Sequence, residues 1–63
     1  MHIPTPEELR ARRGALGMRQ TELAKRAGIS QSMVARIEAG NVDPRISTLS
    51  KIIGVLNLSL IHI

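Results

Sequence analysis

Residues 20–37 read QTELAKRAGISQSMVARI, and this stretch decides the fold. Two short helical segments, 20–27 and 31–39, lie on either side of Gly28. A small residue such as Ala24 suits the contact between two helices that cross steeply, and a glycine reverses the chain without strain in the left-handed conformation. Val34 and Ile37 then face inward at helical spacing. The pattern predicts two crossed helices around a tight turn, and a generic helical hairpin is the alternative.

A helix over about residues 6–16 is predicted before this pair. Thr5 is suited to the N-cap, Pro6 to the first helical position, and Glu8 to the return contact of a capping box. Gly17 is placed to end the helix. One face of the helix carries Leu9, Arg13 and Leu16.

Another helix is predicted after the pair, over about residues 46–55, where apolar residues recur every three or four positions. The last residues favour a short strand over about 58–62. The chain is therefore predicted to be one all-α domain, residues 1–63, with a compact four-helix fold, a central pair over 20–39 and a C-terminal segment over 58–63.

Composition points to a polyanionic partner. The 63 residues contain nine Lys and Arg against five Asp and Glu, a formal net charge of +4 and a pI near 11.3. Such a balance favours nucleic acid or a membrane surface. The basic residues are spread over several helices, which disfavours a membrane-surface peptide. The chain has no aromatic residue on which to stack unpaired bases, which disfavours binding of single strands or RNA.

Several other functions lose support in the same way. The chain has no cysteine, so disulfides are excluded, and this fits a reducing compartment such as the cytoplasm. His2 and His62 are the two imidazoles and lie at opposite ends of the chain, so no metal site is expected. There is no glycine-rich phosphate loop and one aspartate, Asp43, in a predicted turn. We therefore expect neither an enzyme nor a cofactor.

The chain resembles the lambda-repressor-like, or Cro/C1-type (XRE), helix-turn-helix family over residues 7–56. The resemblance rests on the stretches MRQTELA (18–24), AGISQS (27–32) and RIEAG (36–40), with Pro44 and Leu49 at the family spacing. It implies a compact bundle of four or five helices. It also implies a dimeric repressor that binds double-stranded operator DNA, with helix 31–39 in the major groove.

The resemblance and helical geometry together predict the residues that read bases. With Val34 and Ile37 inward, the outward face carries Gln31, Ser32, Ala35 and Arg36. Glutamine can bind adenine with two hydrogen bonds, and arginine can bind guanine in the same way. The alternative is a solvated polar face without a ligand.

Phosphate contacts are predicted at the rim of this helix, from Arg19, Gln20 and Arg45 and from the backbone of Asn41 and Val42. Arg19 departs from the family pattern, which has Ser or Thr there to cap the second helix. An arginine side chain cannot cap, and its charge opposes the helix dipole. A bound phosphate would account for the departure.

A second implication of the resemblance is structural. It predicts a partly buried ion pair between Arg13 and Glu38, which ties the first helix to the end of the recognition helix.

The C-terminal segment is similar to the ends of HipB- and HigA-like antitoxins of the same family. In HipB-like members a short strand pairs with its symmetry mate across the dimer. Dimerisation is therefore assigned to Leu58, Leu60, Ile61 and Ile63. A frayed end, or the start of a linker to a further domain, is the alternative.

Three functions follow from these patterns. The first is a homodimeric repressor bound to a pseudo-palindromic operator in the cytoplasm, on the nucleoid. The second is an antitoxin that binds a toxin protein and regulates its own synthesis. The third is the N-terminal DNA-reading module of a larger regulator.

Overall fold

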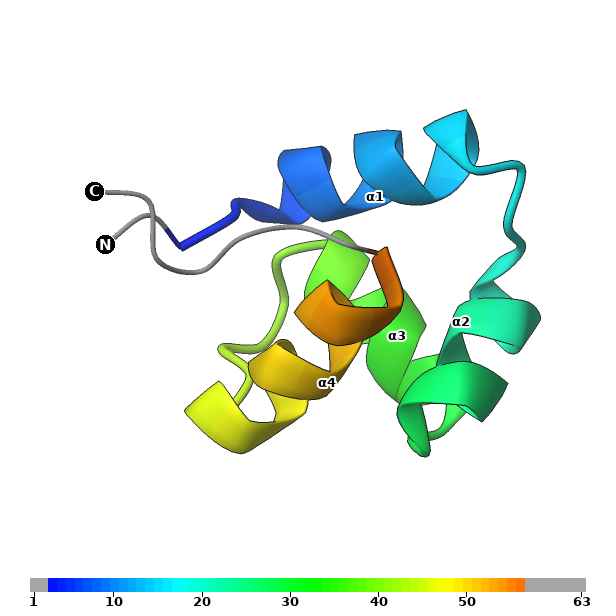
Figure 1. Cartoon of the computed structure of the whole chain (residues 1–63). Coiled ribbons are helices and arrows are strands. Elements are labelled where there is room, and N and C mark those ends of the chain that lie inside the picture. The colour runs from blue at the N-terminus through cyan, green and yellow to red at the C-terminus, as the bar shows by residue number, and fades with distance from the viewer. Residues whose placement is uncertain (1–2, 57–63) are drawn as a thin grey trace.

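The computed structural model describes residues 3–56, which form four α-helices (Figure 1). Their bounds are α1 Pro6–Ala15, α2 Gln20–Ala27, α3 Gln31–Glu38 and α4 Ile46–Leu56. The all-α prediction is confirmed for this part of the chain, and each helix begins at the predicted residue. Leu16 and Ala39 lie at C-caps, so α1 and α3 end one residue earlier than predicted, and α4 continues to Leu56. The predicted strand over 58–62 and its dimerisation residues lie outside the described residues.

Side chains that precede the helices explain two of the starts. The Thr5 hydroxyl accepts a hydrogen bond from the Glu8 amide at 3.2 Å, and the Glu8 carboxylate accepts one from the Thr5 amide at 3.2 Å. The Ser30 hydroxyl accepts a bond from the Met33 amide at 3.1 Å. Each bond satisfies a backbone N–H that the helix itself leaves unpaired. These caps fix where α1 and α3 begin.

The turn between α2 and α3 depends on Gly28. Its φ of 73° lies in the left-handed region, where a side chain is strained. The Ile29 amide then donates to the Ala24 carbonyl at 3.0 Å and closes the end of α2. Ala24 is buried at this crossing, so the small residue lets the helices approach. The predicted pair of crossed helices is therefore present.

One apolar core lies between the four helices. α1 packs on α3 and α4, and α2 packs on the same two helices (Figure 1). Leu9 carries the core contact of α1, but Leu16 is 44% exposed. The helix ends at Ala15, the chain turns at Gly17, whose φ is 67°, and Met18 is buried in the core. The core residues are Leu9, Met18, Leu23, Ala24, Ala27, Val34, Ile37, Leu49, Ile52, Ile53 and Leu56.

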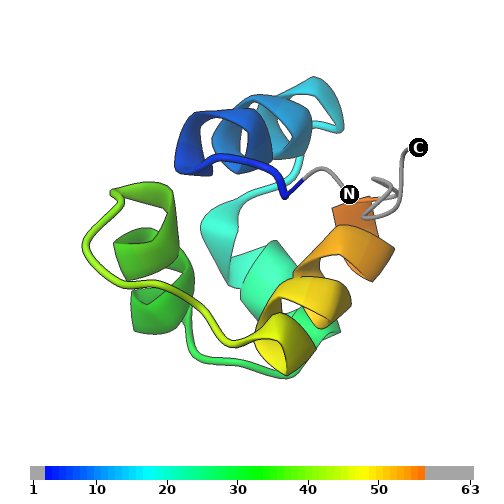
Figure 2. The ribbon, with the colours of Figure 1, turned by 90° about the vertical axis from the view of Figure 1, so that its left-hand side faces the viewer.

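α3 occupies an edge of the molecule. Viewed from the side, α3 and α4 lie at opposite margins below α1, so no other described helix covers the outer side of α3 (Figure 2). At the other margin, the Arg12 Nε donates to the Leu56 carbonyl at 3.0 Å and fastens the end of α4 to α1. Within residues 3–56, no helix has the length and apolar character needed to cross a lipid bilayer.

Candidate nucleic-acid interface

The outer side of α3 is polar. Gln31, Ser32 and Arg36 are exposed and Ala35 is half-buried, whereas Val34 and Ile37 face the core. The four outward residues are spaced i, i+1, i+4 and i+5, which places them on one stripe of the helix. The structure therefore brings together the residues that the sequence assigns to base reading. The Ser32 hydroxyl lies 3.4 Å from that of Ser30.

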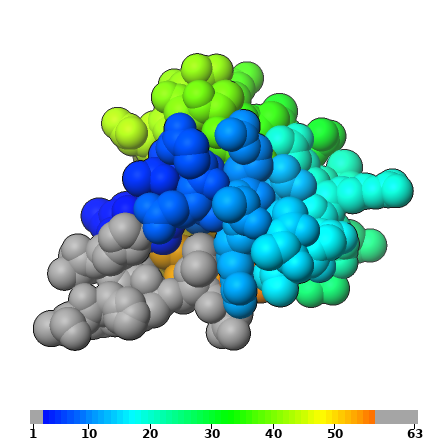
Figure 3. Space-filling model, turned by 90° about the horizontal axis from the view of Figure 1, so that it is seen from above, coloured from blue at the N-terminus to red at the C-terminus, as the bar shows by residue number. Residues whose placement is uncertain are grey.

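A second set of predicted contact residues lies outside α3, at the start of α2 and in the segment that follows α3. Arg19 is exposed at the N-cap of α2, and its side chain makes no capping hydrogen bond. Beyond the other end of α3, Asn41 and Arg45 are exposed. In the view from above, the segment that follows α3 forms an edge of the molecule beyond α1 (Figure 3). In the sequence, one basic residue, Arg19, precedes the α2–α3 pair and another, Arg45, follows it.

The segment after α3 is held by apolar packing. This segment and the start of α1 together line an apolar pocket of about 220 Å³. Pro6 and Leu9 line one side of the pocket, and Val42 and Pro44 line the other. Val42 is half-buried and packs against the core. Its side chain is thus structural, and its backbone remains the group with which it would contact a phosphate.

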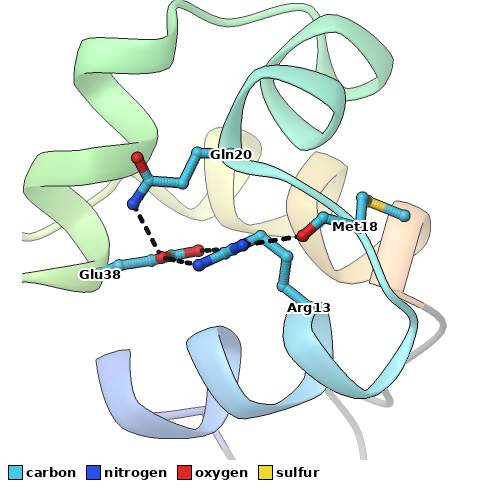
Figure 4. A network of polar contacts seen from close by, with 4 residues as sticks. All are labelled: Arg13, Met18, Gln20 and Glu38. Carbon is cyan, nitrogen blue, oxygen red and sulfur yellow. Dashed lines mark hydrogen bonds and ion pairs between the residues drawn. The ribbon is translucent and has the colours of Figure 1, made fainter.

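A polar network joins the interface to α1 (Figure 4). The Glu38 carboxylate is bound by Arg13 at two points, Nε to Oε2 at 2.7 Å and Nη2 to Oε1 at 2.9 Å. The Arg13 Nη1 donates to the Met18 carbonyl at 2.8 Å. Glu38 is buried, with 6% of its surface exposed. Its hydrogen bond with Arg13 raises the pKa of the guanidinium above its ordinary value, against the effect of burial.

Gln20 belongs to the same network. Its Nε2 donates to Glu38 Oε1 at 3.1 Å, so one of its two amide hydrogens is used inside the protein. The sequence predicts a phosphate contact for this side chain and does not predict its bond to Glu38. The two residues are 18 positions apart, and only the crossing of α2 and α3 brings them together. No local pattern in the sequence signals this bond.

The comparisons with known proteins agree with this geometry. A family model described as helix-turn-helix matches residues 9–63. The chain belongs to the helix-turn-helix family. Members of this family are DNA-binding transcription regulators, and α2 and α3 supply the two helices of the motif.

Two curated relatives are similar to this helix-turn-helix chain. An uncharacterized HTH-type transcriptional regulator of Haemophilus influenzae is 39% identical over 60 residues, which cover 95% of this chain and 61% of that protein. Another from Sinorhizobium fredii is 36% identical over 55 residues, which cover 87% of this chain and 28% of that protein. The chain thus spans about three fifths and about a quarter of the two relatives.

Proposed function

We propose that residues 1–63 form a DNA-reading domain of a transcription regulator, which binds a specific duplex through the outer side of α3. The observation that carries the proposal is the exposed stripe of Gln31, Ser32 and Arg36 on a helix that no other described helix covers. An α-helix of this kind fits the major groove, where each base pair presents a distinct pattern of donors and acceptors.

Each residue of the stripe has a defined chemistry in that groove. Gln31 pairs with adenine through N6 and N7, and Arg36 pairs with guanine through O6 and N7. Ser32 donates to or accepts from a base or a phosphate, and Ala35 offers its methyl group to thymine. Among the described residues, Arg36 has no ion-pair partner. Its exposed guanidinium is therefore free to make a bidentate contact with a base.

Phosphate contacts from residues outside α3 set the register of the helix on the duplex. Arg19 and Gln20 contact the backbone at the start of α2, where the helix dipole also favours an anion. Arg45 and the backbone of Asn41 and Val42 contact it beyond α3. Such contacts carry no sequence information themselves, but they fix the orientation in which base contacts form.

The regulator acts as a homodimeric repressor. Two copies place their α3 helices in successive major grooves about 34 Å apart on one face of a pseudo-palindromic operator. The aliphatic residues of the C-terminal segment, Leu58, Leu60, Ile61 and Ile63, supply the contact between the copies. Apolar burial between copies also adds stability that a 63-residue core has in short supply.

Selection from a random duplex library tests the proposal. The purified chain is incubated with the library, and bound duplexes are recovered and sequenced. An inverted repeat with half-sites about one helical turn apart is expected. A single unrepeated half-site would overturn the dimer and indicate a monomeric reading module. Absence of any enrichment would overturn sequence-specific binding and favour an antitoxin whose main ligand is a protein.

Arg19→Ser is predicted to change stability and binding in opposite directions. Serine can accept a hydrogen bond from the first turn of α2, which Arg19 does not do, so unfolding should cost about 1 kcal/mol more. That gain raises the Tm by about 4–8 °C for a domain of this size. The loss of a cation at a phosphate lowers affinity for the selected duplex and reduces the slope of log affinity against log salt by about one.

Lys25→Ser is the matched control. Lys25 is an exposed cation in the last turn of α2, away from the N-cap. Lys25→Ser should neither raise the Tm nor change the salt slope. If Arg19→Ser stabilises the fold and leaves the salt slope unchanged, Arg19 does not contact a phosphate.

A further inference from the structure

We infer that Glu38 is a positioning residue for DNA binding, acting through Gln20: the buried carboxylate fixes the Gln20 amide so that its second N–H is presented to a phosphate. The inference rests on the proposed function, since it concerns the same phosphate site. It gives a role in binding to an ion pair that the sequence treats as structural.

The chemistry of Glu38 decides how the Gln20 amide is oriented. An ionised carboxylate only accepts hydrogen bonds, so the amide nitrogen, and not the amide oxygen, must face it. The Nε2 to Oε1 distance of 3.1 Å agrees with this orientation. The Gln20 carbonyl oxygen points away from Glu38 (Figure 4). Because the amide is planar, its second N–H is fixed in direction once the first is bound.

Arg13 in turn offsets the negative charge of Glu38, which would otherwise oppose a phosphate bound nearby. A carboxylate one side chain away from a bound phosphate would repel it if it carried its charge alone. Arg13 binds both carboxylate oxygens, at 2.7 and 2.9 Å, and so neutralises this charge locally. The Arg13 guanidinium is held by the Met18 carbonyl as well, in the segment that leads into α2. Arg13 on α1 therefore holds Glu38, and Glu38 in turn holds the Gln20 amide.

The buried polar groups of the network are all hydrogen-bonded within the described part of the protein. Glu38 is buried, and no buried side-chain nitrogen or oxygen among the described residues lacks a hydrogen-bond partner. Gln20 itself is half-buried, so part of its surface remains accessible. A side chain held at one end in this way loses less conformational freedom when it binds than a free glutamine does. Pre-organisation is thus the means by which Glu38 contributes to affinity.

A double-mutant cycle on the selected duplex tests the inference. Gln20→Met removes the amide and keeps the length of the side chain, and Glu38→Gln removes the acceptor-only carboxylate. Gln20→Met should weaken binding about tenfold, the effect of one hydrogen bond to a charged group. Glu38→Gln should weaken binding several-fold in the native background and less than twofold in the Gln20→Met background. All affinities are measured at a temperature where circular dichroism shows each variant folded.

Arg12→Lys is the control for general loss of stability. It keeps the charge and removes the Nε donor that binds the Leu56 carbonyl at the far margin of the fold. Its affinity for the duplex should equal that of the native chain. Equal losses from Glu38→Gln in both backgrounds, or native affinity in Gln20→Met, would overturn the inference. Failure of the native chain to bind any duplex would instead overturn the proposed function.

A measurement on the native chain covers the case in which Glu38→Gln does not fold. In ¹⁵N-resolved NMR spectra one side-chain amide proton of Gln20 should lie downfield of its position in a free glutamine and should exchange slowly with water. The exposed Gln31 amide provides the comparison within the same spectrum. Addition of the duplex should shift one Gln20 proton and leave its partner, bound to Glu38, nearly unchanged. Free-glutamine behaviour of Gln20 before addition would overturn the inference.

Discussion

Arg13→Met is expected to destabilise the fold by about 3 kcal/mol, the lower end of what removal of one partner costs a buried ion pair. Methionine keeps most of the aliphatic stem, so the loss comes from the guanidinium and its three hydrogen bonds. Two of those bonds satisfy Glu38, whose carboxylate then stays buried with Gln20 as its one remaining side-chain donor in the described structure. An uncompensated buried charge is among the costliest defects in a protein.

The consequence is large because the domain is small. A chain of 63 residues has a free energy of unfolding of about 3–9 kcal/mol. The loss should lower the Tm by more than 10 °C, since each kcal/mol shifts a domain of this size by about 4–8 °C. Urea denaturation followed by circular dichroism measures the free energy, and a thermal melt measures the Tm.

Arg26→Met is the matched control. Arg26 pairs with Glu22 at 2.9 Å, a distance similar to those in the buried pair, but both side chains are about half exposed, at 57% and 45%. A pair of this kind contributes a few tenths of a kcal/mol. If the two variants lose similar stability, the buried Arg13–Glu38 pair contributes no more to the free energy of folding than the exposed pair does.

The helices were largely predictable because their signals are local. The capping box of Thr5 and Glu8 marks the start of α1, and Ser30 marks the start of α3. Gly28 marks the reversal between α2 and α3. Each of these signals lies within four residues of the boundary that it sets, so the sequence can be read without knowledge of the fold.

Features that depend on tertiary placement were less predictable. Leu16 shares the spacing of the buried Leu9, yet it is exposed because the helix ends before it and Met18 enters the core. The bond between Gln20 and Glu38 joins residues from two helices, and its geometry depends on how these cross. Only the family resemblance predicts the pair of Arg13 and Glu38, because no rule of spacing joins residues 25 positions apart.

The same distinction applies to the binding residues. Helical spacing sorts Gln31, Ser32 and Arg36 onto the exposed side of α3, since Val34 and Ile37 must face the core. Spacing does not separate a residue that reads a base from one that contacts a phosphate. Arg36 and Arg45 are both exposed arginines, and the roles proposed for them differ because Arg36 lies on α3 and Arg45 lies beyond it.

Arg36→Ala and Arg45→Ala are therefore expected to weaken binding in different ways. Loss of a bidentate contact with guanine should lower affinity for the selected duplex by about 10- to 100-fold and remove the preference at one base pair, while affinity for random DNA falls much less. Loss of a phosphate contact should weaken binding to both duplexes by a similar factor and reduce the salt slope by about one.

Selection of bound duplexes with each variant, followed by affinity measurements over a range of salt, separates the two effects. Lys51→Ala, which removes an exposed cation on α4, controls for loss of general positive charge. If Arg36→Ala keeps the base preference and lowers affinity for all duplexes alike, Arg36 contacts the backbone and another residue of α3 reads the bases. Gln31 would then be the next residue to replace, because it lies on the same exposed stripe at the start of the helix.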